Sequence, residues 1–330
     1  MSISNPTHAD IEAAAVRIAP WAVRTPLVES PELGSRLGAR LFLKPETLQR
    51  TGSFKFRGAL NTVLQIPLAR RQNGVVAFSS GNHAQGVAAA AALFGIPATI
   101  VMPKDAPQPK IAGTRKLGAE VVFYDRYSDD REAIAREIVG RTGATLVEPF
   151  DNAMVVAGQG TIGLELAADA KTLGIVLDVA MTPCGGGGLV SGIALALSKS
   201  SPETRVISVE PERFDGMRRS IAAGERTEAP GGALSIADSL MAPMPGRIPF
   251  ALAKDYLAEA LAVNDSDLKA AVSYAFQRLK LVVEPGGAAA LAAALSRKFD
   301  LKNKTAAIVL TGANCDIATV AECCRAVGDP

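Results

Sequence analysis

Histidine and cysteine, the side chains that most often bind metal ions, are scarce in this chain of 330 residues. It has two histidines, His8 and His83, and four cysteines, at positions 184, 315, 323 and 324. A site built from several histidines is therefore excluded, and we expect no metal ligands. The cysteines lack the regular spacing of a disulfide framework, which excludes a small disulfide-stabilised protein.

An excess of charge of one sign is also absent, as are long apolar runs. The chain has 35 basic and 33 acidic residues, a net charge of +2, so we expect no nucleic-acid partner. Glycine, proline or charge interrupts every apolar stretch before the roughly 20 residues that a membrane-spanning helix needs. The first ten residues are polar and do not resemble a signal peptide. We expect a soluble protein of the cytoplasm.

Short apolar runs typical of strands alternate with alanine-rich stretches of helical spacing. Strands are expected at 40–44, 74–79, 98–102, 121–124, 177–181, 206–210 and 306–310. Helices are expected at 53–64, 82–94, 108–117, 129–141 and 153–170, and from residue 189 onward. This alternation predicts parallel sheets with helices on both faces. The strands are too many for one small sheet and no linker divides the chain, so we predict two intertwined α/β domains, with an irregular segment at 227–250 that holds a short helix near 236–241.

A lysine between two phenylalanines is the first candidate for chemistry, in the segment TGSFKFRGA at 51–59. Ser53 is expected to cap a helix, which places Lys55 in its first turn. An apolar pocket and the positive end of a helix would both lower the pKa of this amine, and Schiff-base chemistry requires a neutral amine. The alternative is a solvated lysine at the start of an ordinary amphipathic helix.

A turn of small residues, SSGNHAQG at 79–86, follows an expected strand and opens a helix. Its amides and hydroxyls could approach a bound group closely. Ser80 and His83 do not form a hydrolase pair, since the chain has no G-x-S-x-G segment and the histidine lies on the same helix. A simple capping turn is the alternative.

Four consecutive glycines follow Cys184 between an expected strand and an expected helix. They leave a run of exposed amides at a helix N-terminus, for which phosphate is the natural ligand. The run is not a nucleoside-triphosphate loop, because no lysine follows it. It is not a dinucleotide fingerprint either, because Val190 stands in place of the third glycine. A monophosphate ester fits best, and a flexible turn is the alternative.

Two further segments carry weaker signals. Thr311 follows an apolar strand in LTGAN, where a hydroxyl can point into the crevice at the carboxyl ends of parallel strands. Glu284 opens the segment EPGGA and either faces the same crevice or caps a helix.

One candidate amine, one phosphate cradle and no set of metal ligands describe a site for pyridoxal 5'-phosphate. The segments SFKFRGA, SSGNH, GGGGL, EPGGA and TGAN also occur in the order of a known family. Over essentially its whole length the chain resembles the threonine/serine dehydratase and serine racemase group of fold-type II pyridoxal-phosphate enzymes.

The resemblance implies a tryptophan synthase beta-like α/β fold, with two open, twisted parallel-sheet domains. Residues 1–69 and 150–330 would form the large cofactor-binding domain, and residues 70–149 a small mobile domain. We expect a homodimer, in a short form without the regulatory domain of biosynthetic threonine dehydratases.

The resemblance also implies roles for the cofactor-binding residues. Lys55 would form the Schiff base, with Phe54 beside the cofactor ring. Asn82 would bind the 3-hydroxyl and Thr311 the pyridine nitrogen. The phosphate would be held by Gly185, Gly186, Gly187, Gly188 and Leu189.

The substrate would bind at the turn after the second expected strand. Its carboxylate would be received by Ser80, Gly81, Asn82 and His83. The hydroxyl of Ser80 would face the side of the substrate opposite the lysine, as a second catalytic group.

The chain departs from the family pattern at two places. Many relatives have glycine after Ile-Ala-Asp, against the cofactor face, where this chain has Ser239. Relatives with a structural divalent cation have an acidic residue six positions after the glutamate of Val-Glu-Pro. Here Glu210 is followed by Asp215 at the fifth position and Gly216 at the sixth.

These residues predict α,β-elimination from a β-hydroxy amino acid, giving a 2-oxo acid and ammonia as in threonine and serine dehydratases. Three alternatives stay open: a dehydratase of hydroxyectoine degradation, a serine racemase, and a non-catalytic pyridoxal-phosphate-binding protein. A chromophore bound without turnover would favour the last of these.

Overall fold

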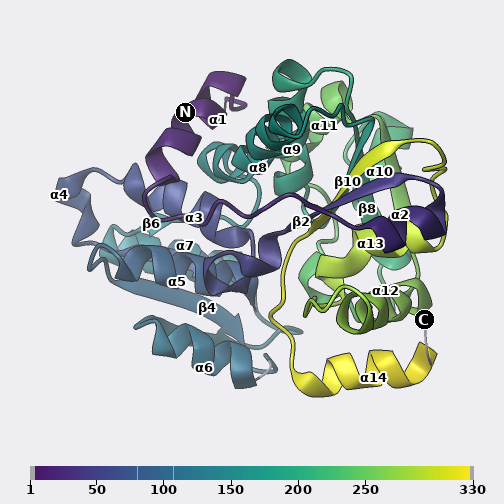
Figure 1. The fold of residues 1–330 in the computed structure, drawn as a ribbon. Coiled ribbons are helices and arrows are strands. Elements are labelled where there is room, and N and C mark those ends of the chain that lie inside the picture. The colour runs from purple at the N-terminus through teal and green to yellow at the C-terminus, as the bar shows by residue number, and fades with distance from the viewer. Residues whose placement is uncertain (1–3, 80, 107, 328–330) are drawn as a thin grey trace.

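Two β-sheets are built from alternating strands and helices in the computed structural model, which describes residues 4–79, 81–106 and 108–327 (Figure 1). The larger sheet has six strands in the order β1 (Val28–Glu29), β2 (Arg40–Pro45), β10 (Thr305–Leu310), β7 (Val179–Pro183), β8 (Arg205–Pro211) and β9 (Glu259–Val263). β1 pairs antiparallel with β2, and the other neighbours are parallel. The smaller sheet has four parallel strands in the order β5 (Glu120–Tyr124), β4 (Ala98–Pro103), β3 (Val75–Phe78) and β6 (Thr145–Leu146).

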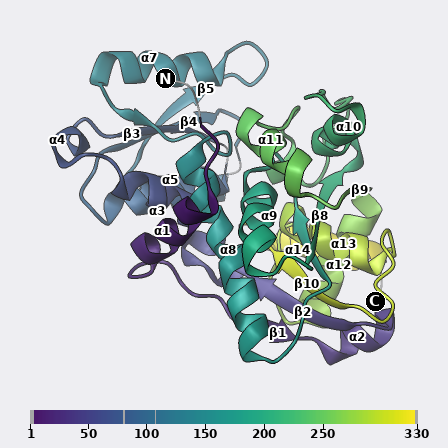
Figure 2. The same ribbon diagram turned by 90° about the horizontal axis from the view of Figure 1, so that it is seen from above.

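Helices cover both faces of the six-stranded sheet (Figure 2). One face packs against α8 (Ala153–Thr172), α9 (Gly188–Ser200), α10 (Gly216–Ala223) and α11 (Arg247–Tyr256). The other packs against α2 (Pro31–Leu37), α12 (Asp265–Gln277), α13 (Ala289–Leu295) and α14 (Ile317–Val327). Side chains along each strand alternate between the two faces: Leu41 and Leu43 join the second layer, and Phe42 joins the first.

The four-stranded sheet is covered in the same way. α5 (Asn82–Ala92), with α3 (Lys55–Leu64) and α6 (Gln108–Lys116) beside it, lies on one face, and α7 (Arg131–Thr142) lies on the other. The remaining helical segments are α1 (His8–Ile18), α4 (Leu68–Arg71), η1 (Glu46–Leu48), η2 (Arg50–Gly52), η3 (Glu212–Phe214), η4 (Asp238–Leu240) and η5 (Gly286–Ala288). Within the described residues, no helix is both long and apolar enough to cross a lipid bilayer.

Helix α8 is the support on which α3 and α9 both pack. The contacts are too close for larger residues: a Cβ on Gly158 of α8 would lie 2.6 Å from the Cα of Gly58 in α3. A Cβ on Gly192 of α9 would lie 2.5 Å from the Val156 carbonyl oxygen of α8. Since α3 begins at Lys55 and α9 begins in the glycine run, these contacts fix the relative positions of two predicted site segments.

A buried cluster of charges ties α3 to β2, η1 and α8. Arg57 donates to Glu46 at 2.7 and 2.8 Å and to Glu165 at 2.6 Å, and Lys44 lies 2.7 Å from Glu165. Burial alone would lower the pKa of Arg57, but the carboxylates of Glu46 and Glu165 raise it by more. The net effect is a raised pKa, so Arg57 stays charged. Each buried charge therefore has a partner of opposite sign, as a low-dielectric interior requires.

The sequence predictions of the fold are confirmed in their main features. All seven expected strands form, with ends within two residues of the prediction, and helices lie on both faces of each sheet. The sequence did not indicate β9, the two-residue strands or the helices near the chain ends. The irregular segment was predicted too long, since α11 begins at Arg247 rather than after 250. Its first turn is capped by Asp151, whose carboxylate accepts from the Ile248 amide at 2.9 Å and lies too far away in sequence to be recognised.

Candidate active site

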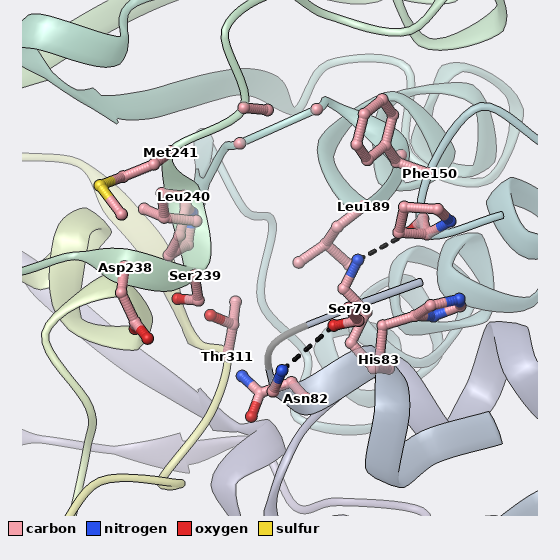
Figure 3. A pocket seen from close by; sticks show the side chains of 18 of the residues that line it. Ser79, Asn82, His83, Phe150, Leu189, Asp238, Ser239, Leu240, Met241 and Thr311 are labelled. Carbon is pink, nitrogen blue, oxygen red and sulfur yellow. Dashed lines mark hydrogen bonds between the residues drawn. The ribbon is translucent and has the colours of Figure 1, made fainter. Parts of the chain in front are cut away.

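The predicted site residues come together in one pocket at the carboxyl ends of β3, β7 and β10 (Figure 3). Those that line it are Phe54, Lys55, Gly81, Asn82, His83, Gly185, Gly186, Gly187, Gly188, Leu189 and Thr311. Ser80 lies outside the described residues. A pocket at the carboxyl ends of parallel strands is the usual place for ligands in open α/β sheets.

Lys55 is the first residue of α3, and its amine lies inside the pocket. Nζ donates a hydrogen bond to the Pro149 carbonyl at 2.7 Å and lies 5.2 Å from the centre of the Phe54 ring. Burial lowers the pKa of this amine to about 8. Far more of this amine is therefore neutral near physiological pH than of an ordinary lysine, and nucleophilic or basic chemistry requires the neutral form.

The prediction that Ser53 caps α3 is wrong. The residue at the N-cap position is Phe54, which makes no side-chain cap. Ser53 is extended and pairs with Gly312 in an isolated bridge, so its hydroxyl does not turn toward the helix amides. The hydroxyl is buried and has no hydrogen-bond partner among the described residues.

The glycine run forms a tight loop that leads into α9. A Cβ on Gly186 would lie 2.3 Å from the ring of Phe150, and Gly187 has a φ of +91°, which L side chains rarely adopt. α9 has no side-chain cap, so the amides of its first turn lack the partner that a helix start needs. An anion in the pocket would supply it.

The first residue of α5 is held by two side chains from the part of the chain that contains the six-stranded sheet. Asn82 donates to Glu284, and its carbonyl oxygen accepts from Asn314 at 2.8 Å. The second carboxylate oxygen of Glu284 is buried with no hydrogen-bond partner among the described residues. Burial raises the pKa of Glu284 to about 7. Glu284 therefore faces the pocket rather than serving only as a helix cap.

His83 is buried and neutral in this pocket. Nε2 lies 2.8 Å from the Val147 carbonyl, which can only accept, so Nε2 carries the proton. Burial, together with the nearby Lys55 amine, lowers the pKa of His83 to about 3. The imidazole cannot contribute a positive charge for substrate binding, and any contact of His83 with a carboxylate would come from its backbone amide.

Two basic side chains in the pocket wall were not found from the sequence. Lys110 of α6 forms an ion pair with Asp238 of η4 at 2.6 Å. Arg131 is the first residue of α7, and its guanidinium lies 5.5 Å from the centre of the Phe78 ring. Both come from helices with no recognisable motif, and only the topology brings them to the pocket.

The carboxylates of Glu210 and Asp215 are engaged by this chain's own groups. Glu210 accepts from the backbone amides of Met217 and Arg218, both at 2.8 Å. Asp215 accepts from Arg218 Nε at 2.9 Å and from Arg219 Nε at 2.7 Å. In the described part of the chain, no group of three or more histidine, cysteine or acidic side chains is placed to hold a metal ion.

These features fit pyridoxal phosphate. The uncapped start of α9 and the glycine loop suit its phosphate, and the Lys55 amine suits its aldehyde. Thr311 and Asn82 offer a hydroxyl and an amide in the same pocket for the polar atoms of the ring.

Comparisons with known proteins also indicate a pyridoxal-phosphate enzyme. The family model described as "Pyridoxal-phosphate dependent enzyme" matches residues 18–312. The chain is 43% identical to an L-threonine ammonia-lyase of Thermotoga maritima, over 94% of this chain and 76% of that protein. It is also 43% identical to an L-threo-3-hydroxyaspartate ammonia-lyase of a Pseudomonas species, over 94% of this chain and 96% of that protein. The structure of maize serine racemase superposes with a TM-score of 0.90 and 34% identity, covering 97% of each chain.

In the apoprotein, the rate at which an amine-selective reagent labels Lys55 should rise with pH, with a midpoint near pH 8. Burial favours the neutral amine, which is the reactive form, so labelling should rise as pH increases through that value. Peptide mass spectrometry after brief acetylation between pH 6 and 11 measures it, and a Lys55→Arg variant should lose this label alone. A midpoint near the ordinary value of 10.5 would contradict the burial of the amine.

Proposed function

The chain belongs to the family of pyridoxal-phosphate dependent enzymes, and from that premise we infer that it is an ammonia-lyase acting on a β-hydroxy amino acid. The reaction removes the α-proton and the β-hydroxyl as water. The released enamine takes up water and loses ammonia, which leaves a 2-oxo acid. The observation that carries this proposal is a buried amine with a lowered pKa in the same pocket as an uncapped glycine-loop helix.

Residues from both parts of the chain would hold the cofactor. The amides of 185–189 would bind its phosphate, Lys55 would bind its aldehyde, and Phe54 would lie against its ring. Thr311 provides a neutral hydroxyl for the pyridine nitrogen, and Asn82 provides an amide for the 3-hydroxyl. Bound pyridoxal phosphate supplies the electron sink that makes the α-proton of an amino acid acidic.

The chain's own groups then handle the substrate. The first-turn amides of α5 have no side-chain cap and line the pocket, so they can receive the α-carboxylate. The Lys55 amine takes the α-proton, and its hydrogen bond to the Pro149 carbonyl fixes its direction. We assign to Ser80, by its place in the SSGNH segment, the face of the substrate opposite Lys55.

We also propose that residues 70–149 form a small mobile domain, and 1–69 with 150–330 the large one. The four-stranded sheet lies wholly within the first of these segments. The contacts Asn82–Glu284 and Lys110–Asp238 join the two parts at the pocket. A homodimer in the cytoplasm remains our expectation for the assembled enzyme.

Purified enzyme should release equal amounts of ammonia and 2-oxo acid from at least one of L-threonine, L-serine and L-threo-3-hydroxyaspartate. Lys55→Ala should lower turnover below detection without changing the melting temperature by more than a few degrees, because it removes the base and not a core side chain. Chiral analysis of the L-serine reaction tests for racemisation. Normal turnover by Lys55→Ala would overturn the proposal, and D-serine formed without ammonia would favour a racemase.

Among β-hydroxy amino acids, the charges of the pocket favour one with a second carboxylate. Lys110 is neutralised by Asp238, whereas no carboxylate among the described residues lies within ion-pair distance of Arg131. Its guanidinium stacks on Phe78 and remains available to an anion in the pocket. L-threo-3-hydroxyaspartate, the substrate named for two of the relatives, has such a carboxylate.

Arg131→Met should lower kcat/KM for L-threo-3-hydroxyaspartate by about 10- to 100-fold, the effect expected when a charged hydrogen bond is lost. kcat/KM for L-threonine should change by less than about 3-fold, because threonine has no second carboxylate. Steady-state kinetics on both substrates measure this, with Arg141→Met at the exposed end of α7 as the control. An equal loss on both substrates would mean that Arg131 binds the α-carboxylate, which they share.

A further inference from the structure

Ser239 lies in η4, in the wall of the pocket. Its side chain is directed at Gly286, the first residue of η5. The position that a Cβ on Gly286 would take lies 2.2 Å from Ser239 Oγ and 3.5 Å from Ser239 Cβ. The serine hydroxyl therefore occupies the space in which a side chain at 286 would begin.

The backbone of Gly286 does not itself require glycine. It belongs to a 3-10 helix and is not one of the glycines with positive φ. An L-residue could adopt this conformation without strain. Its second-nearest neighbour, Leu240 Cγ, would lie 3.2 Å from the added Cβ, a close contact that a shift of a few tenths of an ångström relieves. The atom that comes closest to a side chain at position 286 is therefore the hydroxyl oxygen of Ser239.

η4 has little room to move away from η5. On its other side lies the glycine loop, where a Cβ on Gly185 would be only 3.1 Å from Leu240 Cα. An added methyl group at 286 would push η4 toward that loop and into the pocket that both segments line. The packing of residues 239 and 286 therefore determines the position of η4, which forms this wall of the pocket.

We propose that Ser239 and Gly286 form a matched pair in which the glycine accommodates the serine hydroxyl, so that η4 keeps its distance from the glycine loop and pyridoxal phosphate can enter. Gly286 is thus the positioning residue, because its missing side chain lets η4 stand clear of the pocket while position 239 carries a hydroxyl. The proposal rests on the proposed function only in taking pyridoxal phosphate as the occupant of the pocket.

The test is a double-mutant cycle of Ser239→Ala and Gly286→Ala, because alanine at 239 removes the clashing oxygen alone. The dissociation constant of pyridoxal phosphate is measured by titrating each apoprotein well below its melting temperature. Gly286→Ala should weaken binding by at least about 10-fold, because the displaced wall leaves less room for the cofactor. Ser239→Ala should change it by less than about 3-fold, and the double variant should bind within about 3-fold of Ser239→Ala. Gly140→Ala is the control, because nothing lies within 4 Å of its added Cβ.

An equal loss from Gly286→Ala in both backgrounds, or no loss in either, would overturn the proposal. If Gly286→Ala does not fold alone, recovery of folding and binding in the double variant supports the pairing, and failure of the double variant rejects it. The melting temperature of each apoprotein separates a loss of stability from a change in the pocket. Wild-type protein that binds no pyridoxal phosphate would overturn the proposed function and this pairing with it, whereas binding and turnover without coupling would reject the pairing alone.

Discussion

The close packing of α3 and α9 on α8 is the constraint on which the pocket depends. The helices approach at Gly58, Gly158 and Gly192, where no Cβ could be accommodated. This brings the starts of α3 and α9 to the same pocket, so that the Lys55 amine lies opposite a helix start that needs an anion. Within the pocket the amine is buried, and burial lowers its pKa.

The pocket is completed only where the two sheets meet. The start of α5 comes from the four-stranded sheet, but Glu284 and Asn314, which orient Asn82, belong to the six-stranded part. Lys110 reaches across in the same way to Asp238. If the four-stranded part moves as we propose, these contacts would break and the surroundings of a bound substrate would change. Substrate binding and the arrangement of the two sheets would then be coupled.

The sequence predicted what is encoded locally. A glycine run, a lysine between phenylalanines and a turn of small residues each have a distinct composition, and the structure brings their described residues together. What it could not predict depends on distant partners. Arg131 and Lys110 are single basic residues on helices without a motif, and topology alone brings them to the pocket. Ser53 was misassigned because its pairing with Gly312 spans most of the chain.

Reduction of the purified holoenzyme with borohydride, followed by peptide mass spectrometry, tests the central claim most directly. The reaction fixes the cofactor covalently on whichever amine holds its aldehyde. We expect a pyridoxyl group on Lys55 and on no other lysine. The most informative rival is Lys110, whose amine lines the same pocket but is paired with Asp238. A pyridoxyl group on Lys110, or on any lysine other than Lys55, would contradict the account.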